Sequence, residues 1–116
     1  MKTILVVEDE DSLRLLYEHE LSDSGYKVIT TSSGEDAISI LAKQKVDLVV
    51  LDIRLTGING LEALEEMLLK NRNLKVVINT AYANYKDDFS SWLADAYLIK
   101  SSDLSELKST IQELLQ

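Results

Sequence analysis

The sequence predicts an α/β fold in which five parallel strands form one doubly wound sheet, with helices packed on both of its faces. Two observations predict it. Short, β-branched apolar runs alternate along the chain with longer segments in which apolar residues recur at helical spacing. Three of the runs are almost continuously apolar, which is typical of strands that a parallel sheet buries on both faces. The pattern corresponds to five consecutive strand–helix units.

The predicted strands are the short β-branched runs of the sequence. They cover residues 3–7, 26–30, 47–51, 74–79 and 96–99. Gly57 and Gly60 mark the loop that follows the third of these strands. Because a helical pattern follows each strand, we expect right-handed crossovers between neighbouring strands of one parallel sheet.

A helix is predicted after each strand, because apolar residues recur there three or four positions apart. The five apolar stripes begin at Leu13, Ala37, Leu61, Tyr85 and Leu104. Gly25 follows the first helix in a position typical of a helix C-terminus, and Ser32 or Ser33 can cap the second. Asp103, with Glu106 three residues later, resembles a capping box before the last helix.

Composition excludes several classes of protein. The 116 residues suit one domain, which we expect to span residues 1–116. A net charge of −8 disfavours nucleic acid as a direct partner and is compatible with cation binding by a soluble monomer. Without cysteine there is no disulfide, thiolate metal site or cysteine nucleophile. The apolar run at residues 4–7 is too short for a signal peptide and nothing later spans a membrane, so we expect a cytoplasmic protein.

Polar and charged residues follow the predicted strands at their carboxyl ends, where ligands bind in sheets of this kind. The second strand ends without a charge at Thr30 and Thr31. The residues at the other four ends are Glu8, Asp9, Glu10 and Asp11 after the first, Asp52 after the third, Asn79 and Thr80 on the fourth, and Lys100 after the fifth. These strand ends are therefore the candidate site.

The acidic residues among them suit a hard divalent cation. Carboxylates brought together repel one another unless a cation compensates, and Mg²⁺ is usually held by one or two carboxylates together with other oxygens. Glu8, Asp9 and Asp52 form a plausible set. The alternative is a solvated acidic turn that begins a helix, where the helix dipole favours acids. That alternative fits Glu10 and Asp11, with Asp11 as the helix N-cap.

Asp52 is ambiguous when taken alone, because an Asp after an apolar strand is often only a turn former. An Asp carboxylate can also attack phosphorus and form an aspartyl phosphate. That chemistry needs a metal ion beside it and donors for the phosphoryl oxygens. The Thr80 hydroxyl and the Lys100 ammonium supply such donors. Their joint placement at strand ends of one sheet favours phosphoryl chemistry over a purely structural role.

Four motifs resemble the response-regulator receiver domain of two-component signalling, the CheY-like family. They are ILVVEDE, DLVVLDIRLTGINGLE, VVINTAY and AYLIKSS, and the resemblance runs from residue 2 to residue 115. It implies a flavodoxin-like sheet with strand order 2-1-3-4-5. It also implies a switch that accepts a phosphoryl group on Asp52 from a histidine kinase or a phosphotransfer protein. Such a domain is a self-phosphorylating acceptor and not an enzyme with independent turnover.

The resemblance assigns roles to residues at the metal site. Asp52 corresponds to the phosphoacceptor. Glu8, Asp9 and Asp52 correspond to the Mg²⁺ ligands, and the backbone carbonyl of Arg54 completes the ligands from the protein. Mg²⁺ is therefore the cofactor that the family implies.

Further roles implied by the resemblance belong to the switch. Thr80 contacts the phosphoryl group and moves once it is present, and the backbone N–H of Ala81 donates to the same group. Lys100 pairs with the phosphate, and Tyr97 matches the aromatic residue that turns inward when Thr80 moves. Kinases usually dock on the first helix of the family. The face made by the fourth helix, fifth strand and fifth helix is the usual output surface.

The sequence departs from the family pattern at two places. Thr56 and Ser101 stand where relatives usually have proline, and the second of these prolines normally follows a cis bond. The bond between Lys100 and Ser101 is therefore either cis at a cost of about 3–4 kcal/mol or trans along a different path. Arg54 and Tyr82 occupy the two positions that tune phosphate lifetime in the family. Both are bulky and neither is an obvious base, which predicts slow self-dephosphorylation.

Other functions remain as alternatives. One is a constitutive protein–protein interaction module with a receiver fold, and another is the receiver fragment of a longer response regulator. A haloacid-dehalogenase-type phosphatase would use a D-x-D pattern, which Asp9 and Asp11 fit loosely. A flavodoxin would need a phosphate-binding loop after the first strand. For a receiver we expect a sensor kinase or phosphotransfer protein upstream and a protein target downstream, with a monomer or a phosphorylation-dependent dimer.

Overall fold

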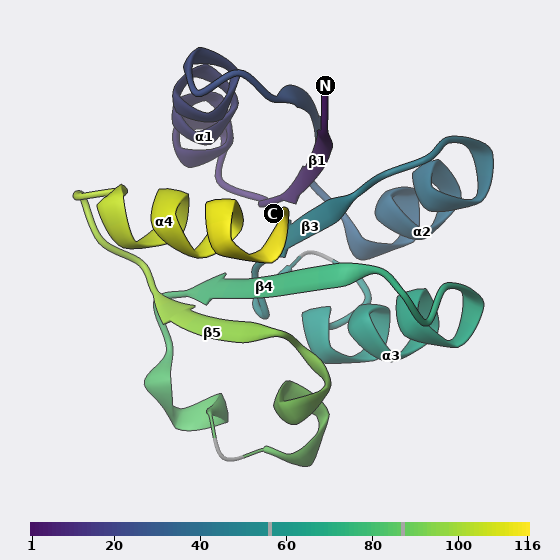
Figure 1. The fold of residues 1–116 in the computed structure, drawn as a ribbon. Coiled ribbons are helices and arrows are strands. Elements are labelled where there is room, and N and C mark those ends of the chain that lie inside the picture. The colour runs from purple at the N-terminus through teal and green to yellow at the C-terminus, as the bar shows by residue number, and fades with distance from the viewer. Residues whose placement is uncertain (56, 87) are drawn as a thin grey trace.

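Five parallel strands form one sheet in the order β2-β1-β3-β4-β5 (Figure 1), which confirms the predicted strand order. The structure is a computed structural model that describes residues 1–55, 57–86 and 88–116. The strands are β1 Thr3–Val7, β2 Lys27–Thr31, β3 Leu48–Leu51, β4 Lys75–Thr80 and β5 Ala96–Ile99. Their bounds lie within one residue of the predicted ones. Thr56, one of the two departures from the family pattern, lies outside the described residues.

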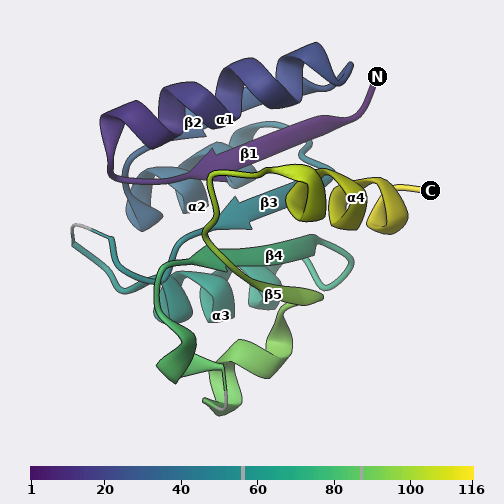
Figure 2. The same ribbon diagram turned by 90° about the vertical axis from the view of Figure 1, so that its left-hand side faces the viewer.

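In the described part of the chain, four α-helices pack on the sheet, two on each face. They are α1 Asp11–Asp23, α2 Gly34–Lys43, α3 Gly60–Lys70 and α4 Ser105–Leu114. Apolar residues of α1 and α4 share one buried cluster with side chains of the central strands, whereas those of α2 and α3 share another on the opposite face. Figure 2 shows the sheet between these two layers. Within the described part of the chain, no helix is long and apolar enough to cross a lipid bilayer.

The predicted fourth helix, between β4 and β5, is wrong. The segment instead forms two short 3₁₀ helices, η1 Ala83–Tyr85 and η2 Phe89–Leu93. Asn, Asp and Ser are frequent here, and their side chains compete for backbone groups that a helix needs. The Ser91 hydroxyl, for example, donates to the Tyr85 carbonyl at 2.6 Å. The chain's single tryptophan, Trp92, lies in η2 and is 67% exposed.

Helix ends follow the sequence signals with two exceptions. Gly25 ends α1 with φ of +99°, and the Ser33 hydroxyl accepts the Asp36 N–H at the start of α2, so both predictions are confirmed. Asp11 is the first residue of α1 and not its N-cap, because Glu10 takes that position in extended conformation. The predicted capping box before α4 is wrong, because Leu104 and not Asp103 is the N-cap. A carboxylate oxygen of Asp103 instead accepts the backbone N–H of Ser105, the first residue of the helix, at 2.9 Å.

Candidate functional site

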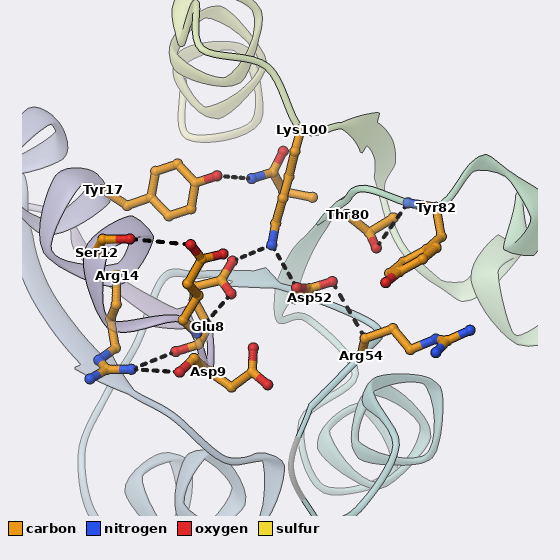
Figure 3. Close-up of polar contacts among 12 residues, drawn as sticks. Glu8, Asp9, Ser12, Arg14, Tyr17, Asp52, Arg54, Thr80, Tyr82 and Lys100 are labelled. Carbon is orange, nitrogen blue, oxygen red and sulfur yellow. Dashed lines mark hydrogen bonds and ion pairs between the residues drawn. The ribbon is translucent and has the colours of Figure 1, made fainter.

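The carboxyl ends of β1, β3 and β5 bring Glu8, Asp52 and Lys100 into contact. Val7 pairs with Leu51 across neighbouring strands, so the residues that follow them, Glu8 and Asp52, lie side by side. The Lys100 ammonium nitrogen lies 2.7 Å from Glu8 Oε1 and 2.7 Å from Asp52 Oδ2. Figure 3 shows the lysine side chain reaching between the two carboxylates.

Burial and mutual hydrogen bonds shift the pKa values of Glu8 and Lys100. Glu8 is 2% exposed and Asp52 is 4% exposed. Burial raises the pKa of Glu8, although hydrogen bonds from Lys100 and from the Glu10 N–H act in the opposite direction. Burial alone would lower the pKa of Lys100, but its bonds to Asp52 and Glu8 outweigh burial and raise that pKa. One ammonium group therefore serves two buried carboxyl groups.

A third carboxylate completes an oxygen-rich cluster. Carboxylate oxygens of Glu8, Asp9 and Asp52 lie within 4.8 Å of one another. Arg14 holds the turn that carries the first two, since its guanidinium donates to the Glu8 carbonyl at 2.9 Å and to the Asp9 carbonyl at 3.4 Å. Such a set of hard oxygen donors fits Mg²⁺ and offers nothing to a soft metal. Arg54 adjoins the cluster, because its N–H lies 3.4 Å from Asp52 Oδ1.

Gly60, the first residue of α3, packs directly against the backbone that carries Asp52. A Cβ at this position would lie 2.2 Å from the Asp52 carbonyl oxygen and 2.7 Å from the Ile53 Cα. Only glycine allows so close an approach between the helix and the end of β3. The sequence marked Gly60 as a loop residue, whereas the structure gives it a role in fixing the position of Asp52.

Thr80 and Tyr97 are linked through the backbone of Tyr82. Thr80 is fully buried at the end of β4, and its hydroxyl accepts the Tyr82 N–H at 3.4 Å. The Tyr97 hydroxyl donates to the Tyr82 carbonyl. Burial raises the pKa of Tyr97, so it remains a neutral donor at physiological pH. Ala81, which lies between Thr80 and Tyr82 in the chain, is exposed.

The side chains of Arg54 and Tyr82 form a cover beside Asp52. The Arg54 guanidinium carbon lies 4.5 Å from the centre of the Tyr82 ring and 5.9 Å from that of Tyr85. The two rings meet edge to face with centroids 6.4 Å apart. In Figure 3 the Arg54 side chain runs away from Asp52 and beneath the Tyr82 ring. Cation–π attraction therefore holds these side chains together at the mouth of the site.

A sequence model of the response regulator receiver domain matches residues 4–112 of the chain. The chain belongs to this family. The phosphatase and flavodoxin alternatives therefore do not apply to this receiver domain.

Solved structures agree with the family. TrrA from Thermotoga maritima, in complex with Mg²⁺-BeF, has a TM-score of 0.96 and 43% identity, covering 98% of this chain and 99% of TrrA. TrrA in complex with the histidine kinase ThkA has a TM-score of 0.94 and 43% identity, and each chain is covered completely.

Curated relatives include sporulation initiation phosphotransferase F of Bacillus subtilis, which is 29% identical over 97% of this chain and 92% of its own. The probable transcriptional regulator ycf27 of Cyanophora paradoxa is 35% identical over 99% of this chain. The present chain spans 48% of the length of that regulator. It therefore matches only about half of a transcriptional regulator of this kind.

The loop after Lys100 takes a trans path in this receiver. The peptide bond between Lys100 and Ser101 is trans, which answers the question that the missing proline raised. The Ser101 hydroxyl accepts the Asp103 N–H at 3.1 Å and so turns the chain toward α4. A side-chain hydrogen bond thus shapes the loop at the position where relatives usually have proline.

Tyr17 and Asn79 form a polar pair that the sequence did not reveal. The Asn79 side-chain amide donates to the Tyr17 hydroxyl at 3.1 Å, and both side chains are buried. Burial raises the pKa of Tyr17, whose hydroxyl also lies in the electrostatic field of Lys100. The only sequence signal was the polar residue Asn79 within an otherwise apolar strand end. The pair ties α1 to the strand that carries Thr80.

Proposed function

We propose that this receiver domain is a phosphorylation-activated switch that accepts a phosphoryl group on Asp52 from a histidine kinase or a phosphotransfer protein. The observation that carries the proposal is the Lys100 ammonium group held 2.7 Å from Asp52, beside a cluster of three carboxylates. The cluster has the ligands for a cation and the lysine has the charge for a phosphoryl group. The domain acts as an acceptor and has no independent turnover.

The transfer would use the oxygen of Asp52 that Lys100 does not hold. Oδ2 contacts the ammonium, whereas Oδ1 has only a long contact with the Arg54 N–H. Oδ1 attacks the phosphorus of a phosphohistidine, and the phosphorus–nitrogen bond breaks with its electron pair left on the imidazole nitrogen, which takes a proton. Lys100 then pairs with a phosphoryl oxygen.

Glu8, Asp9 and Asp52, with the Arg54 carbonyl, would hold Mg²⁺. When bound, the ion neutralises charge between the carboxylates and the phosphoryl oxygens. Mg²⁺-BeF in the TrrA structure, at 43% identity, supports this cofactor. The Thr80 hydroxyl and the Ala81 N–H would donate to the remaining phosphoryl oxygens.

Phosphorylation would be passed on through Tyr82. Thr80 must release the Tyr82 N–H to bond the phosphoryl group, and that residue's carbonyl is the partner of Tyr97. The switch would therefore change the surface formed by η2, β5 and α4, which takes the place of the predicted output face. A downstream protein target would bind there, and the domain would act as a monomer or as a phosphorylation-dependent dimer in the cytoplasm.

The proposed upstream partner is a sensor histidine kinase that docks on α1. The ThkA–TrrA complex supports it, because TrrA shares 43% identity over the whole chain. Leu15 and Leu16 are exposed on α1 and offer apolar contact for such a partner.

The direct test is phosphorylation by acetyl phosphate with Mg²⁺, followed by intact-protein mass spectrometry. We expect a mass gain of one phosphoryl group, lost in Asp52→Asn and on removal of Mg²⁺ by EDTA. Asp36→Asn removes an exposed carboxylate on α2 and should leave the gain unchanged. No gain in the unmodified protein would overturn the proposal in favour of a constitutive interaction module.

A further inference from the structure

A band of basic side chains lies at the amino-terminal edge of the sheet, opposite the Asp52 site. In Figure 2 the arrowheads of β1 and β3 point to the Asp52 edge, while both chain termini lie toward the other. Seven of the 12 Lys and Arg residues of the chain begin strands, end helices or lie in the turns between them at this second edge, and all seven are exposed. We call them the basic edge: Lys2, Lys27, Lys43, Lys45, Lys70, Arg72 and Lys75.

Strand register brings these residues together. The Lys27 N–H donates to the Lys2 carbonyl at 2.9 Å, so the starts of β1 and β2 are adjacent. Lys2 and Lys45 line the same surface hollow of about 340 Å³. Lys75 pairs with Leu48, which places the start of β4 beside the start of β3. The starts of four neighbouring strands therefore place basic side chains along one edge of the sheet.

Acidic neighbours offset the charge of the strip only in part. Among the residues that the structure describes, none of the ion pairs includes a member of the basic edge. Asp47 and Asp95 lie at the same edge and keep their negative charge, although each accepts a strand N–H at 2.8 Å, from Thr3 and Val76 respectively. Asp47 also lines the hollow that Lys2 and Lys45 share, so acidic neighbours offset part of the charge of the basic edge.

Helix dipoles explain the positions of only two of the seven basic residues. Lys43 and Lys70 lie in the last turns of α2 and α3, where a cation is favoured. The other five basic residues lie outside α-helices. A chain with net charge −8 thus keeps an exposed basic strip that its own fold does not require.

An apolar hollow adjoins the strip. A space of about 380 Å³ lies between the C-terminal halves of α2 and α3. Its lining is Ile38, Leu41, Ala42, Met67, Lys70 and Asn71. Because Lys70 belongs to both features, a bound chain could place an apolar side chain in the hollow and carboxylates on the strip.

We propose that the basic edge and this hollow bind an acidic segment of a partner protein, with an apolar residue among its Asp and Glu side chains. Charge complementarity identifies the occupant. A short acidic peptide would interact electrostatically mainly with the basic edge itself, because charges more than about 10 Å away are screened at 0.1 M salt. A long polyanion such as nucleic acid would also meet the excess of acids elsewhere on the chain, and the lining of the hollow includes no aromatic ring for base stacking. The surface leaves the Asp52 edge free, so the partner and the phosphoryl group can be present together.

The test uses a fluorescein-labelled synthetic peptide of alternating Glu and Asp that contains two leucines. Its binding to the protein is measured by fluorescence anisotropy at low and at physiological salt concentration. We expect saturable binding that weakens about threefold with Lys45→Glu and about threefold with Lys70→Glu. Lys86→Glu makes the same charge change near η1, outside the basic edge, and should leave binding unchanged. A peptide with serine in place of leucine should bind about tenfold more weakly.

Circular dichroism checks that each variant is folded, and Lys2→Glu replaces any that is not. Three results would overturn the proposal. The first is absence of peptide binding at low salt, and the second is an equal loss with Lys86→Glu. The third is equal or tighter binding of a single-stranded oligonucleotide or of phosphatidylserine vesicles, which would assign the strip to another class of partner.

Discussion

Lys100 is a single cation shared by two buried carboxyl groups, and this shortage of positive charge governs the site. Its nitrogen lies 2.7 Å from an oxygen of each, while Asp9 adds a third carboxylate nearby. Burying a charged group costs on the order of several kcal/mol in lost hydration, unless neighbouring groups of opposite charge compensate. The site therefore carries more negative than positive charge, which is expected to lower the stability of the domain without a bound cation.

The first prediction concerns Glu8, whose pKa burial raises. A raised folded-state pKa means that its contribution to stability is present below its ordinary pKa and is lost as pH rises through the folded value. At neutral pH without metal, Glu8→Gln should therefore raise the thermal unfolding midpoint by a few degrees. Mg²⁺ should raise the midpoint of the unmodified protein and not that of the variant.

The control for this prediction is Glu66→Gln, an exposed carboxylate on α3. It should change neither the midpoint nor the Mg²⁺ response. If Glu8→Gln instead lowered the midpoint in EDTA, the ion pair with Lys100 would outweigh the cost of burying the carboxylate.

The second prediction concerns the cover formed by Arg54 and Tyr82, which lie 4.5 Å apart by guanidinium carbon and ring centre. We expect slow self-dephosphorylation, because neither side chain positions an attacking water. Tyr82→Ala should shorten the phosphate half-life about two- to fivefold, in line with the strength of a cation–π contact. The half-life is measured after removal of acetyl phosphate in Mg²⁺. A half-life of seconds in the unmodified domain would contradict the expectation.

At the scale of elements, the junction between β3 and α3 positions Asp52. Gly60 lets the helix start against the Asp52 carbonyl, and the Gly60 N–H donates to the Ile53 carbonyl at 2.9 Å. The Glu35 carboxylate of α2 accepts the Ile58 N–H at 3.1 Å and so ties the intervening loop to a second helix. The position of Asp52 thus depends on helix packing as well as on the strand.

The third prediction follows from this junction. Gly60→Ala would push the helix away from the end of β3, and we expect a loss of about 1–3 kcal/mol of unfolding free energy, as for other overpacked sites. Phosphorylation by acetyl phosphate should also slow. The measurements are urea unfolding and the rate of mass gain.

Gly25→Ala is the matched control, because Gly25 has φ of +99° but no atom within 4 Å of an added Cβ. It should cost about 1–2 kcal/mol through backbone strain and leave phosphorylation unchanged. Equal slowing in both variants would show that stability alone, and not the position of Asp52, limits the reaction.

The sequence predicted the elements where pattern and packing agree. All five strands and four of the helices appear as expected, because runs such as residues 47–51 are too apolar to lie outside a sheet core. The predicted fourth helix failed because its apolar stripe had the right spacing while polar side chains such as Ser91 bonded the backbone. The pair of Tyr17 and Asn79 could not be predicted, since Tyr17 read only as part of the apolar face of the first helix and no local pattern links it to the end of β4.

At the scale of the whole molecule, charge is segregated between the two edges of the sheet. Acids gather at the carboxyl edge beside Asp52, and the basic edge lies at the other end of the strands. The net charge of −8 thus does not describe the amino-terminal edge, where the seven basic residues lie beside Asp47 and Asp95. Such a distribution orients approaching charged partners before contact, and the effect declines with salt.

The fourth prediction concerns folding of the whole chain, which contains no proline. Prolyl isomerisation in unfolded chains causes refolding phases of about 10–100 s at 25 °C. Refolding from urea, followed by stopped-flow circular dichroism, should therefore lack such a phase. A slow phase that a prolyl isomerase leaves unchanged would point to another slow step, and the expectation of fast refolding would be wrong.

Trp92 gives the domain a built-in optical reporter. It is the chain's single tryptophan, it lies in η2 at the proposed output surface, and it is 67% exposed. Its emission will shift to shorter wavelength when a partner covers that surface, and excitation at the long-wavelength edge of indole absorption avoids the chain's five tyrosines. Target binding can thus be followed without attaching a dye.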